Sequence, residues 1–173
     1  MFKVRIRGVD RYIRDLAKLD QQTYHAAQDG IEKAAEHLLQ RVVAKIGVYQ
    51  PTGGDPGGYG RWKKLKYQTV KKKLLKYNVG DRPLLASGAL KASFKIIKGG
   101  KGRLSASVGS DSDYLIHHVY GAPGASVPMR DPIRITAMEE MEVCHKIIEN
   151  EIMKEIDTWW WLNGIYKNDG YRI

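Results

Sequence analysis

The fold of this chain is decided by residues 20–47, which read DQQTYHAAQDGIEKAAEHLLQRVVAKIG. Apolar positions recur there at spacings of three and four: Tyr24, Ala27, Ile31, Ala34, Leu38, Val42 and Lys45/Ile46. This is the period of an amphipathic helix with one buried face. We expect Asp20 to cap the helix and Gly47 to end it. Gly30 weakens it by about 1 kcal/mol relative to alanine, which the length of the pattern outweighs.

A second long helix is predicted to begin near Thr136. Its apolar face carries Ala137, Met141, Cys144, Ile148, Ile152 and Ile156, and six glutamates supply its polar side. Cys144 lies on the apolar face, so we interpret it as a small core residue rather than a nucleophile.

Shorter elements are predicted before the first long helix and after it. Residues 2–6 alternate apolar and charged side chains, as a half-buried strand does, and a short helix capped by Asp10 follows. Residues 67–77 favour a helix with Val70 and Leu74 facing inward.

Two strands are expected over residues 90–98 and 103–109, joined by the glycine-rich turn 99–102 into a hairpin. Residues 114–132 contain two glycines and three prolines, and we expect them to be irregular. The predicted fold class is therefore α+β, with a small antiparallel sheet packed against two long amphipathic helices.

The domain organisation follows from composition. Residues 1–157 form one α+β domain, and residues 158–173 form a tryptophan-rich C-terminal extension. Residues 47–60 contain six glycines and two prolines, which predicts a mobile loop inside the domain.

Positive charge is concentrated in the middle of the chain. The net charge is +10, yet residues 61–103 hold fourteen Lys and Arg against the single acid Asp81, which leaves −3 for the remainder. So uneven a field steers binding towards an anionic partner, whether nucleic acid, membrane or an acidic protein face.

Several functional classes are not indicated. One cysteine excludes an internal disulfide framework and a cysteine-rich zinc site. No apolar run is long enough to span a membrane, and the first seven residues lack the apolar core of a secretory signal, so we expect synthesis in the cytoplasm.

We identify no residues that convincingly indicate catalysis or metal binding. His117 and His118 are adjacent, so their side chains point to different sides of a helix or strand and are poorly placed to chelate one ion. Residues 53–58 are glycine-rich but lack the lysine and hydroxyl residue of a phosphate-binding loop. We expect neither an enzyme nor a cofactor.

Two aromatic features suggest contacts with partners. Trp62, Tyr67 and Tyr77 are interleaved with eight cations between residues 61 and 76, a mixture suited to nucleic acid, although a solvated face has the same composition. Trp159, Trp160 and Trp161 cannot all face one core, so either they enter an interface or the tail folds back over its own domain.

Four motifs, in order, resemble the virion-morphogenesis and tail-completion proteins of tailed bacteriophages, of the Mu-type family with its neck and tail-terminator relatives. They are Gly60-Arg61-Trp62-Lys63-Lys64-Leu65, then Leu84-Leu85-Ala86-Ser87-Gly88-Ala89-Leu90, then Tyr114 with His118 and Gly121, and finally Pro128-Met129-Arg130. The resemblance covers residues 1–157. Leu115 and Asp131-Pro132-Ile133 depart from the family pattern.

The resemblance implies a structural virion protein that completes or terminates the tail and joins it to the head. Such a protein is made in the host bacterial cytoplasm and works as a homo-oligomeric ring, with a hexamer favoured, around the DNA channel. Its partners are further copies of itself, other neck and tail proteins and DNA, with no membrane. The alternative is a nucleic-acid-binding module that uses residues 61–103.

The candidate functional residues fall into two groups. Expected at a subunit or partner interface are Arg61, Trp62, Lys63, Lys64, Lys66, Arg130, Trp159, Trp160 and Trp161. Expected to hold the structural motifs are Gly88, Tyr114, His118, Gly121 and Pro128.

Overall fold

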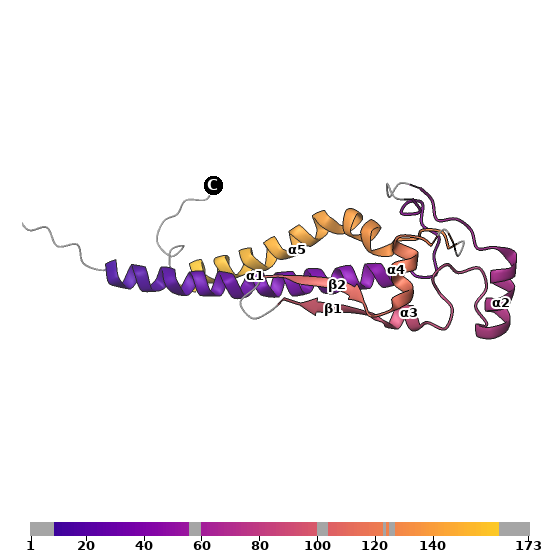
Figure 1. The fold of residues 1–173 in the computed structure, drawn as a ribbon. Helices are drawn as coiled ribbons and strands as arrows, with labels where there is room; N and C mark the ends of the chain where they lie inside the picture. Colours follow the sequence, from indigo (N-terminus) through magenta and orange to yellow (C-terminus); the bar gives the residue numbers. More distant parts are fainter. Residues whose placement is uncertain (1–8, 56–59, 100–103, 123, 125–126, 163–173) are drawn as a thin grey trace, which may run out of the picture.

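The computed structural model describes residues 9–55, 60–99, 104–122, 124 and 127–162. Two long helices, α1 (Val9–Lys45) and α5 (Pro132–Leu162), lie side by side along the length of an elongated molecule (Figure 1). Between them in the chain come α2 (Tyr67–Tyr77), α3 (Ala89–Ala92), strands β1 (Phe94–Lys98) and β2 (Ala106–Ser110), and α4 (Asp113–Val119). The strand expected over residues 2–6 lies outside the described residues.

Helix α1 is one continuous helix of 37 residues. The expectation of a short helix after Asp10 and a separate one after Asp20 is therefore wrong. No glycine or proline stands between the two aspartates, so nothing in the sequence interrupts the hydrogen-bonded backbone there. The predicted end near Gly47 is confirmed, since Gly47 adopts a φ of 94° just beyond the helix.

Helix α5 begins at Pro132, four residues earlier than predicted. The Asp131 carboxylate accepts hydrogen bonds from the backbone N–H groups of Ile133 and Arg134, both at 3.0 Å. This is a side-chain cap followed by proline at the first helical position, where no backbone donor is lost. The helix also continues to Leu162, so the first five residues of the expected tryptophan-rich extension belong to it.

We predict that Asp131→Ala lowers the free energy of unfolding by about 1 kcal/mol, because two backbone donors lose their acceptor. Asp131→Asn keeps an acceptor oxygen and should lose less than half as much. Urea unfolding followed by circular dichroism compares the two variants. Equal losses would mean that the carboxylate charge, not the cap geometry, is what stabilises the helix.

The two long helices approach closely and share a polar network. Gly30 faces the α5 backbone, and a Cβ there would stand 2.9 Å from the Cα of Ile148. Glu140, buried on α5, accepts hydrogen bonds from the Arg41 side chain and from His37 at 2.8 Å. These contacts hold the Glu140 pKa below its usual value, His37 contributing most. The predicted core position of Cys144 is confirmed, because it is 9% exposed.

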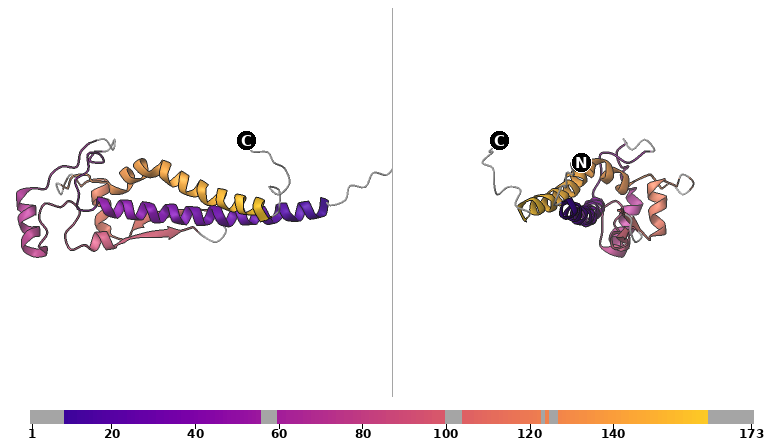
Figure 2. Two further views of the ribbon diagram at one scale, coloured as in Figure 1. Left: turned by 180° about the vertical axis from the view of Figure 1, so that it is seen from behind. Right: turned by 90° about the vertical axis from the view of Figure 1, so that its left-hand side faces the viewer.

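The sheet has two antiparallel strands and packs on α1, on the side away from α5 (Figures 1 and 2). Its register pairs Phe94 with Ser110 and Lys98 with Ala106. Phe94 joins Val42, Ile46 and Leu115 in the hydrophobic core. The predicted α+β class is thus confirmed, with α1 as the layer between sheet and second helix.

Three local predictions need correction. The first expected strand began at residue 90, but 89–92 form α3, started by Gly88 in the left-handed conformation. The stretch 114–132 was expected to be irregular, yet it contains most of α4, which buries Leu115 in the core. Helix α2 has the predicted bounds, but Leu74 is 52% exposed rather than inward.

Candidate functional site

Helix α2 stands at one end of the molecule, beyond the ends of α1 and α5 (Figure 1). None of its residues is buried. Tyr67 and Leu75 are 79% and 78% exposed, although both are large and apolar. An isolated helix of eleven residues is marginal in water, so α2 depends on contacts along one side.

Those contacts line a cleft of about 450 Å³ between α2 and the body of the molecule. Thr69, Lys73 and Tyr77, at a spacing of four, form its α2 wall. The opposite wall and floor come from residues 84–90, with Tyr114, His118 and Arg130. No acidic residue is among the described residues that line it.

The cleft therefore brings together residues from all four motifs singled out in the sequence. Leu65 comes from the first motif, Gly88 from the second, Tyr114 and His118 from the third, and Arg130 from the fourth. They lie as many as 65 positions apart along the chain, so the fold, not local sequence, assembles the site.

Arg130 is the structural link between the basic segment and the rest of the site. Its side chain is buried and donates to the carbonyl oxygen of Lys63 at 2.7 Å, while its backbone N–H donates to the carbonyl of His118 at 2.7 Å. Its Nε has no hydrogen-bond partner among the described residues. Burial lowers the pKa of Arg130, although Tyr49 and Asp81 counteract this.

His118 is the second polar group at the back of the cleft with an unmatched atom. Its Nδ1 is buried and has no hydrogen-bond partner within the described part of the chain. Burial, with smaller contributions from Arg130 and His117, lowers the His118 pKa to about 4. The imidazole is therefore neutral near neutral pH.

Lys73 completes the cationic lining. Its ammonium donates to the carbonyl oxygen of Arg82, which ties α2 to the loop before residue 84. Burial lowers the Lys73 pKa, and the positive charge of Arg130 adds to this while Asp81 opposes it. No acidic side chain among the described residues lines the cleft. A carboxylate or other anion that entered it would therefore be stabilised by Lys73 and Arg130.

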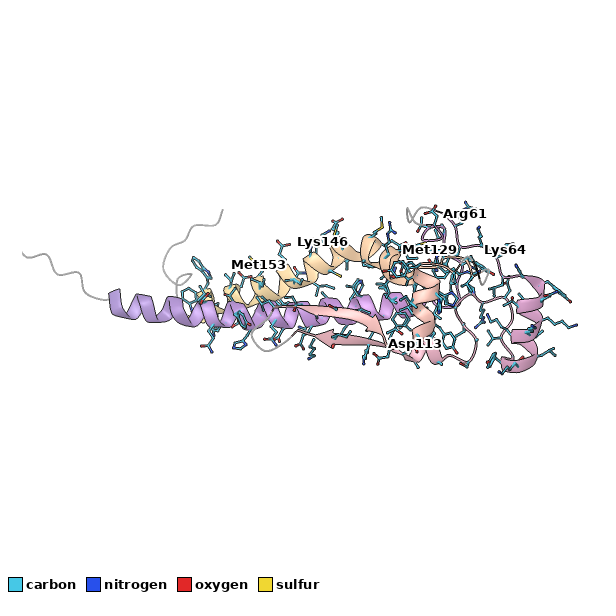
Figure 3. All side chains as sticks on the ribbon, in the orientation of Figure 1. Arg61, Lys64, Asp113, Met129, Lys146 and Met153 are labelled. Atoms are coloured by element: carbon cyan, nitrogen blue, oxygen red, sulfur yellow. The ribbon has the colours of Figure 1, made fainter. Side chains whose placement is uncertain are left out.

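The expected interface residues divide into exposed and buried ones. Arg61, Lys63, Lys64 and Lys66 are exposed, and Figure 3 shows Arg61 and Lys64 at the end of the molecule that carries α2. The assignment of Trp62 and Arg130 to a partner surface is wrong for the free chain, because both are 3% exposed. Trp62 anchors the loop instead, with its indole beside Gly53.

Backbone hydrogen bonds also anchor the loop at residues 47–60. The backbone N–H of Trp62 donates to the carbonyl oxygen of Gln50 at 3.0 Å. The backbone N–H groups of Gly54 and Asp131 donate to the carbonyl oxygens of Gly60 and Gly53, at 2.7 Å and 3.1 Å. The segment is irregular as expected, but the bond from Asp131 holds Gly53 at the start of α5, and the other two bonds close the loop on itself. Its mobility stays a prediction, and residues 56–59 lie outside the described part.

The two structural-motif glycines adopt a backbone conformation that favours glycine. Gly88 and Gly121 have φ values of 86° and 71°. The reason at Gly88 is conformation alone, since a Cβ there would meet nothing within 4 Å. Pro128 lies in the connection between α4 and α5, beside the bridge that pairs Ala122 with Val127.

The three tryptophans lie at the other end of α5, far from the cleft along the helix. Trp161 is 69% exposed and Trp160 is 36% exposed, while Trp159 is half-buried. The prediction that at least one of them faces outward is confirmed. The rings of Trp159 and Trp160 meet edge-to-face, with centroids 6.2 Å apart.

Sequence reasoning missed the inner face of α2. Thr69, Lys73 and Tyr77 were treated only as parts of a basic stretch, yet their spacing of four places them on one face. The spacing was a usable signal. The acidic residue opposite, Asp81, accepts a hydrogen bond from the Tyr49 hydroxyl, and that pairing had no signal in the sequence.

Within the described residues, no three His, Cys, Asp or Glu side chains are placed to hold a metal ion. Burial raises the pKa of the Cys144 thiol, which disfavours the reactive thiolate.

No family model, curated protein or solved structure matches this chain. Among the described helices, no stretch combines the length and hydrophobicity that crossing a membrane requires.

Proposed function

We propose that this chain is a structural protein of a tailed-phage virion, which completes or terminates the tail and joins it to the head. The balance of core and surface carries the proposal. In the described part of the chain, ten apolar residues are buried, and half of these are small or lie along α1. Seventeen large apolar residues are exposed there, and twelve of them lie on α2, α4 and α5. Exposed apolar residues that gather on one helix, as Tyr67, Leu74 and Leu75 do on α2, are typical of an interaction surface.

The secondary structure supports the same conclusion. A two-stranded sheet is marginally stable by itself, and here it relies on one face of α1. No residue of helix α2 is fully buried in its own chain. An elongated subunit with different surfaces at its two ends suits head-to-tail contacts, which close into a ring when the rotation between copies allows it.

The resemblance of the four motifs to tail-completion proteins is the reason for proposing a phage virion as the assembly. Their residues line one cleft, and the residues there that are charged are cationic. The function is to make contacts between copies and with neighbouring neck and tail proteins, around the DNA that passes through. The ring, for which a hexamer is favoured, is tested by native mass spectrometry and electron microscopy of the purified protein. A chain that stays monomeric at every concentration contradicts the proposal.

The exposed lysines at residues 63, 64 and 66 provide a functional test. Reversing all three to glutamate should leave the circular dichroism unchanged, because the side chains are exposed and Arg130 contacts only the Lys63 backbone. It should weaken in vitro joining of heads to tails, most strongly at low ionic strength, where charges act over the longest range.

A matched variant with arginine at the same three positions retains the charge and should join normally. Normal joining by the folded glutamate variant would mean that these lysines form only a solvated face.

The alternative function, a nucleic-acid-binding module, is favoured by the same exposed cations on residues 61–76. Burial of Trp62 removes one stacking residue, which leaves phosphate contacts and the exposed ring of Tyr67. Tight binding of duplex DNA by a monomer, with a steep dependence on salt, would support this function over the ring.

A further inference from the structure

The outward face of α2 is an amphipathic docking surface without a partner in its own chain. Because Thr69, Lys73 and Tyr77 line the cleft, the opposite side of the helix carries Tyr67, Lys71, Leu74 and Leu75. All four are exposed, the leucines at 52% and 78%. Apolar residues at positions i, i+7 and i+8 are the anchors of a helix that packs into a complementary surface.

A surface of matching chemistry lies along α5. Exposed residues at spacings of three and four make a stripe that faces away from α1: Met138, Glu142, His145, Glu149, Met153 and, one further interval of seven, Trp160. Methionine side chains adapt to the shape of a partner, which suits a docking surface. Figure 3 shows Met153 and Lys146 on α5, away from the end that carries Arg61 and Lys64.

The two surfaces are complementary in charge. The charged residue on the outward face of α2 is Lys71, and the acids on the α5 stripe are Glu142 and Glu149. Glu139, Glu140 and Glu151 are engaged by cations of α1, and Glu142 by Lys146. Glu149 has no ion pair within the described residues, so its carboxylate is available to an incoming lysine.

One molecule cannot bring its own two surfaces together. Glu149 is seventeen residues into α5, which is about 26 Å from the start of the helix, and α2 lies beyond that start (Figure 1). We propose that α2 of one copy packs on the stripe Met138–Met153 of the next, with Lys71 of the first copy facing Glu149 of the second. This inference rests on the proposed assembly and names the contact that forms it.

The proposed contact is heterologous, because each copy offers α2 to one neighbour and α5 to the other. Such contacts repeat around a ring or along a filament when the rotation between neighbouring copies is less than a half-turn. The apolar anchors Tyr67 and Leu75 become buried, which accounts for a short helix that exposes both in the free chain.

A charge-reversal cycle tests the contact. Lys71→Glu and Glu149→Lys should each weaken self-association by about tenfold or more, because a like charge then faces the partner. The chain that carries both changes regains the pair, and its association should return to within about threefold of the wild type. The measurement is sedimentation velocity across a concentration series, with circular dichroism to confirm folding.

The control is Lys91→Glu, which makes the same charge change at an exposed site on α3 and should leave association unaltered. Association of Lys71→Glu at the wild-type level, or a double variant no better than the single ones, overturns the contact while the ring proposal stands. A wild-type monomer overturns both. Loss of binding to a labelled DNA duplex by Lys71→Glu, with association intact, would assign α2 to nucleic acid instead.

Discussion

Gly53→Ala is expected to lower the free energy of unfolding by about 3 kcal/mol or more, a large fraction of the stability of a small domain. Two effects add. Gly53 has a φ of 78°, a conformation that costs an alanine roughly 1–2 kcal/mol. A Cβ there would also stand 2.5 Å from Cγ2 of Ile135 and 3.1 Å from the carbonyl oxygen of Asp131. Ile135 is among the most deeply buried side chains, so it cannot yield without disturbing the start of α5.

Two further glycines separate the two effects. Gly88→Ala shares the positive φ but meets nothing within 4 Å, so it should cost about 1–2 kcal/mol. Gly80→Ala has neither a positive φ nor a close neighbour, and its stability should change by less than about 0.5 kcal/mol. Urea unfolding of the three variants gives the order. If Gly53→Ala were no worse than Gly88→Ala, the contact of this loop with α5 would not be tight.

The periodicity of the sequence predicts much of the fold, because both long helices carry apolar residues at every third or fourth position. Glycine was harder to interpret. In residues 47–60 the glycines indicate weak structure, and at Gly30 a cost to the helix, but Gly53 and Gly30 are both places where another element comes too close for a side chain. Local sequence carries no information about such close approaches, since the neighbour is about a hundred residues away.

The sequence identified the motifs that form the candidate site, but it did not show where in the fold they meet. Tyr114, His118 and Arg130 were singled out, and the structure brings them to one cleft. The inward direction of Trp62 was not predictable, because an aromatic residue among cations has the same composition whether it stacks on a ligand or anchors a loop. Asp131-Pro132 was the clearest missed signal, since a capping residue before proline marks the start of a helix.

The partly buried histidine of the cleft, His118, should make the stability of the protein depend on pH below neutrality. In the folded chain the His118 pKa is about 4, against 6.5 in an unfolded one. Between these values the unfolded state binds the proton and the folded state does not, so stability falls as the pH falls through this range. Carboxylates such as Glu140, whose pKa is lowered from 4.5, act only at lower pH.

We therefore expect a loss of about 1–2 kcal/mol between about pH 7 and pH 5, after allowing for solvent screening of a partly buried ring. His118→Gln removes the titrating group, so the variant should have a flatter pH profile over this window. His25→Gln is the matched control, because this histidine is exposed on α1 and does not line the cleft, and the variant should retain the wild-type slope. The prediction is tested by comparing the urea unfolding midpoints of the wild type and the two variants at several pH values. A His118→Gln profile as steep as the wild type would mean that the imidazole already takes up its proton in the folded cleft, which requires an anion beside Arg130 and Lys73 to offset their charge.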